Sequence, residues 1–391
     1  MKKVLLGTTA LMAAGVIAGA SAQAAEPIKL SVGGFMTERV GVSSNDYHTT
    51  DTRDGAEGWD VKQDAEIIFK GSTKLDNGIT VGVEVQLEAN SAGSASSVSD
   101  TTAATNQIDE TFMFISGNFG RVNIGGENTA AYLMHYRHGS AGGTLSLDEG
   151  TVTRWIPQPL GSTAHTYTMN SAPLVSNDQQ SITYFTPRFE GIQGGISYVP
   201  SASRTQGSVL TPDRKATVTT NDSATNNNFD GISLAVNFDR KFDQARVQLS
   251  GSWERYHGAD STTQDDLEQV AFGGIVSFGG FSVGASWKEV DDDVATGATT
   301  SGDQTVFAAG AGYRMGPTYF TVNYIRGEAP ATTTIAGDDE SVAYMAAASH
   351  NIGPGISVHG AIMRAEYDGE VAGGTDDADG WAGVVGATAR F

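Results

Sequence analysis

The stretch between Asn128 and Gln180 holds the densest group of side chains that could do chemistry. Among its histidines and charged residues are His135, Arg137, His138, Asp148, Glu149, Arg154 and His165. The pair His135 and His138 could suggest metal ligands, but no carboxylate or third histidine follows at a convincing interval, so the signal for a metal is weak. Charged side chains of both signs can instead act on ions through their electric field, which is strong where water is scarce. We therefore expect the charged side chains of this stretch to attract or repel ions and not to catalyse a reaction.

Covalent catalysis would need a nucleophile and a base close together. The histidines are spread along the chain without such a grouping, at His48, His135, His138, His165, His257, His350 and His359. Paired glycines such as Gly125-Gly126 and Gly273-Gly274 fall in strand-like runs, where a bulge or close packing explains them. No phosphate-binding glycine loop is present in the sequence. These patterns predict that the protein is not an enzyme.

Acidic clusters mark three of the long polar connections. They are Asp291-Asp292-Asp293, Asp338-Asp339-Glu340 and Asp376-Asp377-Ala378-Asp379. Grouped carboxylates can hold a hard cation such as Ca²⁺, but none of the three has the spacing of a defined calcium loop. Solvated acidic loops are the favoured interpretation, with no cofactor expected and loop-bound Ca²⁺ as the alternative. Such loops would raise the local concentration of cations.

The overall charge of −21, from 24 Lys+Arg and 45 Asp+Glu, argues against binding of nucleic acid, whose phosphates need a basic surface. Residues 1–24 are typical of a secretory signal, with Lys2 and Lys3 ahead of an apolar run and Ala22-Gln23-Ala24 as the cleavage site. Residues 25–391 are expected to form a single domain. The chain has no cysteine, which excludes disulfides. No apolar run beyond the signal is long enough for a transmembrane helix.

The elements that must position the charged residues are strands. In the stretch Ile79–Asn90, valines and leucine alternate with Glu84 and other polar residues, and Leu75-Asp76-Asn77-Gly78 before it is a hairpin signal. In the closing stretch Trp381–Phe391, one face is wholly non-polar and has an aromatic residue at each end. This alternation is typical of a strand with lipid on one side and water on the other.

Sixteen such runs follow one another, with short connections on one side and long polar connections on the other. They are Ile28–Val40, Trp59–Lys74, Ile79–Asn90, Gln107–Gly117, Arg121–Glu127, Gln180–Pro187, Ile192–Val199, Phe229–Asp239, Gln244–His257, Leu267–Phe278, Phe281–Val290, Gln304–Arg314, Thr318–Glu328, Ser341–Asn351, Gly355–Tyr367 and Trp381–Phe391. Both ends of the series fall on the short-turn side, so the last strand can pair with the first. Because an open sheet edge is not tolerated in hydrocarbon, the sequence predicts an all-β fold, a closed transmembrane antiparallel β-barrel with short periplasmic turns and long extracellular loops.

Aromatic residues gather near the ends of the predicted strands, as in the girdles of membrane barrels. The expected lower girdle is Phe119, Phe189, Phe242, Phe278, Phe281, Tyr319, Phe320 and Phe391. The expected upper girdle is Trp59, Trp253, Tyr256, Trp287, Tyr324, Tyr367 and Trp381.

Over essentially its whole length after the signal, the chain resembles the general-diffusion porins of Gram-negative bacteria, most closely those of the α- and β-proteobacterial type. The segments that carry the resemblance are Gly33-Gly34-Phe35-Met36, Ile67-Ile68-Phe69-Lys70-Gly71, Leu75 to Val81, Ser116 to Val122, Ser181-Ile182-Thr183-Tyr184 and the terminal Phe391. The resemblance implies an outer-membrane homotrimer, among lipid and lipopolysaccharide, through which small hydrophilic solutes diffuse passively. It also implies that the third long loop folds into the lumen, and that the barrel-assembly machinery reads Phe391.

On this interpretation Asp148 and Glu149 would oppose Arg137 and Arg154, or bases of the wall. The residues expected at the constriction are His135, Arg137, His138, Asp148, Glu149, Arg154, Arg39, Glu66, Lys70, Glu84 and Arg121. The alternative is a loop that lies on the outer mouth. The charge balance predicts a mild preference for cations, and the alternatives are a channel selective for a sugar or an anion, a barrel enzyme and an adhesin. Small residues expected to face outward, Gly34 among them, would let barrels pack closely.

Overall fold

A computed structural model gives the fold. It describes residues 27–47, 58–89, 108–138, 145–147, 151–159, 169–174, 178–201, 228–258, 266–292, 303–330, 337–370 and 377–391. The predicted secretory signal and the residues Asp148, Glu149 and His165 lie outside this set.

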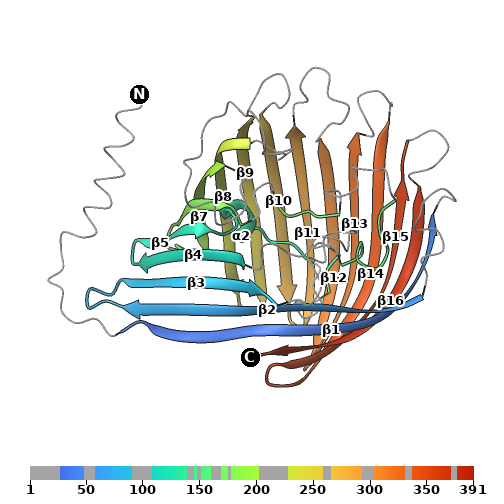
Figure 1. Ribbon diagram of the computed structural model, residues 1–391, viewed down its shortest axis with the longest axis horizontal. Coiled ribbons are helices and arrows are strands. Elements are labelled where there is room, and N and C mark those ends of the chain that lie inside the picture. Colours follow the sequence, from blue (N-terminus) through green and yellow to red (C-terminus); the bar gives the residue numbers. More distant parts are fainter. Residues whose placement is uncertain are drawn as a thin grey trace.

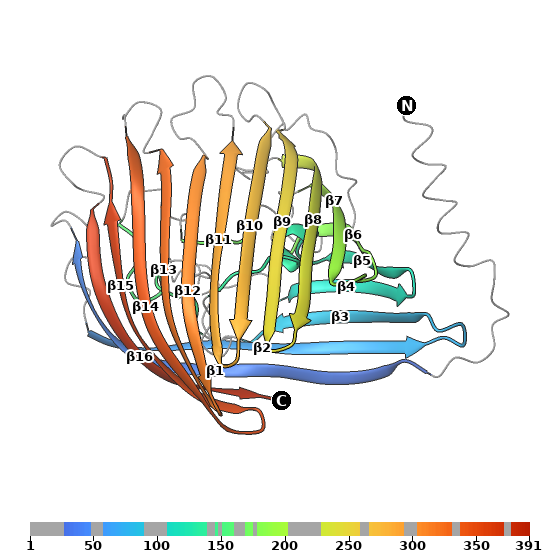
Figure 2. The ribbon, with the colours of Figure 1, turned by 180° about the vertical axis from the view of Figure 1, so that it is seen from behind.

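Sixteen strands form one closed barrel in which each strand pairs antiparallel with its neighbours in sequence (Figures 1 and 2). The strands are β1 (Lys29–Tyr47), β2 (Gly58–Lys74), β3 (Thr80–Glu88), β4 (Ile108–Gly117), β5 (Gly120–Gly126), β6 (Gln180–Phe185), β7 (Ile192–Ser201), β8 (Asn228–Phe242), β9 (Ala245–Gly258), β10 (Leu267–Phe278), β11 (Phe281–Asp292), β12 (Gln304–Met315), β13 (Thr318–Pro330), β14 (Asp338–Gly353), β15 (Ile356–Asp368) and β16 (Ala378–Arg390). A short helix, α2 (Ala130–Leu133), follows β5. The predicted fold class and strand number are confirmed. No helix in the described part of the chain is long and apolar enough to cross a membrane.

The closing strand joins the first strand over nearly its whole length. The register runs from Phe35 opposite Arg390 to Tyr47 opposite Ala378. Beyond it, the backbone N–H groups of Gly34 and Phe391 each donate to the other residue's carbonyl oxygen at 3.1 Å. These bonds explain why the chain can end on a strand without fraying.

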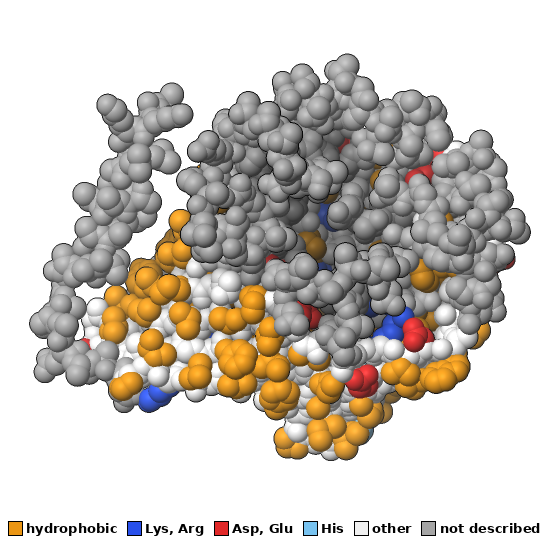
Figure 3. All heavy atoms as spheres, in the orientation of Figure 1, with side chains coloured by type: hydrophobic (Ala, Val, Ile, Leu, Met, Phe, Trp, Pro, Cys, Tyr) orange, Lys and Arg blue, Asp and Glu red, His pale blue; other side chains and the backbone are white. Residues whose placement is uncertain are grey.

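Side chains alternate between the outside of the barrel and its interior. Val385 of β16 and Phe391 directly after it are 64% and 69% exposed on the outside, whereas Ala382 and Val384 are buried inside. Hydrophobic side chains cover the outer surface where β1 to β3 face the viewer in Figure 3. The non-polar face that the sequence predicts on the closing strand therefore does face outward.

Three tyrosines assigned to the aromatic girdles face the interior instead. Tyr256 and Tyr367 are buried, and Tyr319 lies within hydrogen-bond distance of Ser282. The hydroxyl of Tyr367 donates to the carbonyl oxygen of Ile156 at 2.7 Å. A tyrosine can face inward because its hydroxyl finds a partner there. The signal was in the sequence, because alternation along the strand places Tyr256 on the same face as Glu254.

Several strands extend farther toward the long loops than the alternation predicts. β1 continues to Tyr47, and β14 begins at Asp338. At these strand ends polar residues continue the backbone hydrogen bonds of the sheet beyond the apolar outer surface. Because these residues show no alternation of apolar and polar side chains, the sequence pattern does not reveal that they belong to the strand. The described residues of the acidic clusters are therefore partly in strand ends, since Asp338-Asp339-Glu340 opens β14 and Asp379 lies in β16.

Candidate functional site in the lumen

The segment after β5 folds into the barrel and runs along the inner wall (Figures 1 and 2). Its backbone is held by serines that project inward from β7, β8 and β9. The N–H of Ala130 donates to Ser197 Oγ at 2.8 Å, that of Ala131 to Ser233 Oγ at 3.0 Å, and that of Tyr136 to Ser250 Oγ at 2.9 Å. The predicted inward fold of the third long loop is confirmed, and the alternative of a loop on the outer mouth is wrong.

Glycines on the inner face of the next strands let the loop lie directly on the wall. A Cβ at Gly284 of β11 would be 2.7 Å from the Cβ of His138, and one at Gly273 of β10 would collide with the carbonyl oxygen of Tyr136. A real side chain at these positions would push the loop into the lumen. Close packing, one of the two explanations that the sequence offered for Gly273, therefore applies.

The two histidines expected at the constriction contact this wall. His138 Nδ1 lies 3.3 Å from Asn323 Oδ1, and its Nε2 lies 3.2 Å from Ser282 Oγ. Burial lowers the pKa of His135 to about 3 and also lowers the pKa of His138 below its ordinary value. Both rings are therefore neutral at physiological pH, and the contacts give His138 an anchoring role.

The second leg of the loop packs on the inner face of β1 and β15. The hydroxyl groups of Tyr47 and Tyr367 donate at 2.7 Å to the carbonyl oxygens of Pro157 and Ile156. A buried apolar cluster joins the loop residues Leu145, Leu147, Val152, Trp155, Ile156 and Met169 to small and apolar wall residues of β12–β16 and to Tyr47. Apolar side chains of the loop and the wall fill this side of the lumen, so they exclude water and solute from it.

Most of the charged side chains of the predicted constriction lie on the inner faces of β1 to β5. Three carboxylates from β2, β3 and β4 stand together, because oxygen atoms of Glu66, Glu88 and Asp109 all lie within 4.8 Å of one another. Glu66 and Glu88 are direct cross-strand partners. We call these three residues the acidic triad. Carboxylates this close repel one another and attract cations.

More acids surround the triad at the edge of the loop. The side-chain amide of Asn128 donates to Glu110 at 3.1 Å and to Asp178 at 2.6 Å. Burial, followed by the charge of neighbouring carboxylates, raises the pKa of Glu127 to about 7, although the hydrogen bond from Asn123 opposes this. Burial and the charges of Asp109 and Glu110 also raise the pKa of Asp178 well above its ordinary value.

The sequence pattern predicted that Glu66 and Glu84 are at the constriction. It did not predict Glu88 and Asp109, the other two residues of the acidic triad. Glu88 lies on the same face of its strand as Glu84, so alternation could have indicated it. The pairing of β3 with β4 shifts between Val85 and Leu87, and this irregularity lies where β4 carries Asp109. No pattern within one strand predicts that shift, and so none could bring Asp109 to the triad.

The predicted bases of the wall are also in the lumen, and some are paired with acids. Lys70 Nζ lies 2.5 Å from Glu84, and Arg39 lies 3.9 Å from Asp64. Lys70 and Arg121 both approach the ring of Phe114, at 5.6 Å and 4.3 Å from its centroid. Each of these two cations is attracted to the ring by a cation–π interaction.

Of the remaining residues predicted at the constriction, the structure describes Arg137 and Arg154 but not Asp148 and Glu149. Arg154 lies close enough to Arg39 and Glu88 to interact with both electrostatically. Arg137 stacks over the ring of Tyr132, 5.4 Å from its centroid. The expected opposition of Asp148 and Glu149 to these arginines stays a prediction, because both acids are outside the described residues. The described site thus combines a triad-centred acidic region with paired and stacked bases.

Solved structures show the same fold at low sequence identity. An OmpF of Salmonella typhi, in complex with daunomycin, is 14% identical, with 93% of this chain and 98% of that chain covered and a TM-score of 0.60. The anion-selective porin from Comamonas acidovorans is 15% identical, with 93% and 100% covered and a TM-score of 0.56. OmpT of Vibrio cholerae in its trimer form is 11% identical, with 93% and 99% covered and a TM-score of 0.56. No curated protein matched the sequence.

The family model described as Gram-negative porin matches residues 7–370, most of the chain. Together with the closed barrel of sixteen strands and the loop inside it, this match identifies the protein as a member of the Gram-negative porin family, a channel of the outer membrane.

Proposed function

We propose that this porin lets small hydrophilic solutes diffuse passively across the outer membrane, with a mild preference for cations. The observation that carries the proposal is the acidic triad on the inner wall, with Glu110 and Asp178 next to it. Two of the wall bases are already matched by acids, Lys70 by Glu84 and Arg39 by Asp64. The three carboxylates of the triad lie within 4.8 Å of one another, which concentrates negative charge at one place on the wall. A passing cation therefore gains more from the wall than a passing anion does.

Reversal potentials across a planar bilayer with a salt gradient test this proposal. The purified protein should give discrete conductance steps and a reversal potential of the sign that indicates cation preference. A reversal potential of the opposite sign would overturn the preference, and a bilayer that stays electrically silent would overturn the channel itself.

A channel for anions or sugars is the second candidate, and one observation favours it. Phe114 carries Lys70 and Arg121 against its ring, and aromatic surface with cations beside it suits an anion or a sugar. A related fold belongs to the anion-selective porin of Comamonas acidovorans. Block of the current by one sugar or phosphate, at concentrations where other solutes have no effect, would favour this candidate over general diffusion.

The cation preference is expected to increase as pH rises from about 5.5 to about 8.5. The pKa of Glu127 is raised to about 7, and that of Asp178 is raised well above its ordinary value. Both carboxyls are therefore neutral at the lower pH and lose their protons across this interval, which adds negative charge to the lumen. Reversal potentials measured at both values should differ, and a Glu127→Gln/Asp178→Asn variant should lose most of the difference. A wild-type selectivity that is flat over the interval would contradict this assignment.

We infer a homotrimer whose subunits meet on the outer face of β1 and β16. This face presents small residues such as Gly383, Ala387 and Ala389, which allow close approach, and the OmpT relative is described as a trimer. Because the chain has no cysteine, an Ala387→Cys variant should be cross-linked to higher species by a short bismaleimide. Val322→Cys, on the outer face of β13, is the matched control and should stay monomeric. Only monomers from Ala387→Cys would contradict the assigned face.

Export and assembly complete the proposal. Cleavage after Ala24 would leave a chain that begins at Ala25, and the terminal Phe391 lies exposed on the outside, where assembly machinery could read it. The exposed apolar belt suits contact with lipid, and the acidic strand ends above it suit contact with lipopolysaccharide through bridging cations.

A further inference from the structure

The two ends of the loop inside the barrel meet at one buried contact. The loop leaves β5 after Gly126 and returns to β6 at Gln180, and these two residues are direct cross-strand partners. Two residues farther into the loop on each side, Asn128 Nδ2 donates to Asp178 Oδ1 at 2.6 Å, and both residues are buried. We call Asn128 and Asp178 the neck of the loop. Their contact fixes the place where both legs of the loop depart from the wall.

Two carboxyl groups of β4 bind the neck to the wall. Glu110 Oε1 accepts a hydrogen bond from the same Asn128 amide at 3.1 Å. The side chain of Asp178 is hydrogen-bonded to both Asp109 and Glu110. Ionised carboxylates only accept hydrogen bonds, so a bond between two carboxyl groups needs a proton on one of them. The neck is therefore closed through a shared proton.

The surroundings of the neck oppose a further negative charge. Among the described residues, the charged groups that act on it are Asp109 and Glu110 of β4, Glu84 of β3, Glu127 at the start of the loop and Arg121 of β5. All but Arg121 are acids, and Asp109 also belongs to the acidic triad. Burial, followed by the charges of the neighbouring acids, raises the pKa of Asp178 to about 8.

We propose that Asp178 is a positioning residue whose proton holds the neck closed, and that loss of this proton releases the second leg of the loop from β4. The proposal goes beyond passive diffusion, because it makes the position of the loop depend on pH. In an open neck water reaches Asp178, so its pKa falls toward the ordinary value of about 3.9 and the closed neck binds one proton more. The closed neck therefore loses stability as pH rises from this value to about 8, and is insensitive to pH above it.

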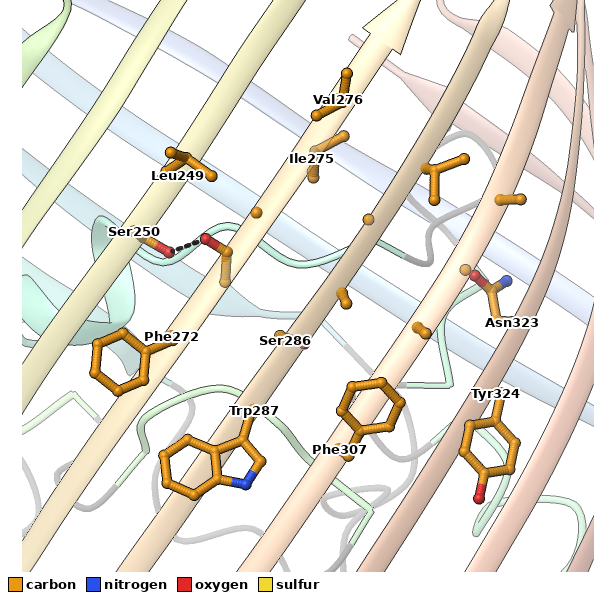
Figure 4. Close-up of a pocket in the computed structure, with 18 of the residues that line it drawn as sticks. Leu249, Ser250, Phe272, Ile275, Val276, Ser286, Trp287, Phe307, Asn323 and Tyr324 are labelled. Carbon is orange, nitrogen blue, oxygen red and sulfur yellow. Dashed lines mark hydrogen bonds between the residues drawn. The ribbon is translucent and has the colours of Figure 1, made fainter.

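A nitroxide spin label on the second leg of the loop gives a direct measurement. The chain has no cysteine, so a Leu174→Cys variant carries one label, at a half-buried position shortly before Asp178. The control label is at Val276→Cys on β10, which lines an apolar hollow of the outer wall together with Leu249 and Phe272 (Figure 4). The line shape of the electron paramagnetic resonance spectrum separates mobile from immobile label. It reports the loop without any transport, so a failure of the proposed cation preference leaves this result unaffected.

The ratio of mobile to immobile label at Leu174→Cys should rise at least about tenfold between about pH 5 and about pH 9, because each pH unit can weaken the closed neck by up to tenfold. The rise should end near pH 8, where Asp178 is ionised in the closed neck as well. The label at Val276→Cys should give the same spectrum throughout.

Asp178→Asn removes the titrating group and should abolish most of the rise. Asparagine still accepts from Asn128 and donates to Glu110, and it tolerates the left-handed backbone of this position, where φ is 55°. Glu110→Gln is the second variant: its amide can donate to an ionised Asp178, so the rise should be smaller than in the parent. A parent spectrum that does not change with pH would overturn the proposal. An undiminished rise in Asp178→Asn would do so too, as would an equal rise at Val276→Cys, which would mean that the whole barrel loosens.

Discussion

Removing the charges of the acidic triad, in a Glu66→Gln/Glu88→Gln/Asp109→Asn variant, is expected to lower the cation-to-anion permeability ratio at least about fourfold. A unit charge about 5 Å from an ion contributes roughly 0.8 kcal/mol even in water, which corresponds to that factor. The three carboxylates lie together in the lumen, with oxygens within 4.8 Å of one another. Glutamine and asparagine keep the shape of each side chain, so pore size and single-channel conductance in symmetric salt should change far less than selectivity.

The matched control removes the same charges from the outside. Glu268, Glu366 and Asp379 are outward carboxylates in contact with Trp253 or Arg364, and their replacement by Gln, Gln and Asn leaves the lumen intact. Reversal potentials in a salt gradient compare the two variants. If the outward variant shifts the ratio as much as the triad variant, the overall charge and not the triad sets selectivity, and our assignment of the site is wrong.

Releasing the loop from the wall is the second change with a large expected effect. In a Ser197→Ala/Ser233→Ala/Ser250→Ala variant, three backbone N–H groups of the loop lose their acceptors. Each buried donor left without a partner costs about 1–3 kcal/mol, which together is enough to compete with docking of the whole segment. We expect a larger and noisier open-channel current, because the segment that narrows the lumen no longer lies on β7 to β9.

Ser252→Ala provides the comparison for this variant. Ser252 is on β9 as well, but its hydroxyl has no hydrogen-bond partner within the described structure. The Ser252→Ala variant therefore removes a serine hydroxyl from β9 without releasing the loop. The current through this variant should match that of the parent protein. Limited proteolysis gives an independent measurement, since the released loop should be cut while the barrel persists. A triple variant with unchanged conductance and an uncut loop would show that the apolar contacts on β12 to β16 hold the loop without the serines.

The sequence by itself determined the barrel. Each strand carries its own alternation of apolar and polar residues, because one side meets lipid and the other meets water, and this local pattern needs no knowledge of the partner strand. The number of runs and the alternation of short and long connections place the first and last strands on the same side. The sheet can therefore close into a barrel, with the last strand paired to the first. The exposed side of β16, from Trp381 to Phe391, and the inward position of Glu84 followed from the same pattern.

Only the tertiary structure decided how the site is assembled. The acidic triad unites residues of three strands through a register that includes a shift near Leu87. The path of the loop depends on serines and glycines of several strands, such as Ser233 and Gly284, each of which is unremarkable in its own segment. The orientation of Tyr367 likewise depends on Ile156 of the loop. Such contacts join positions far apart in the chain, so alternation within a strand cannot encode them, and they exist only once the barrel has closed around the loop.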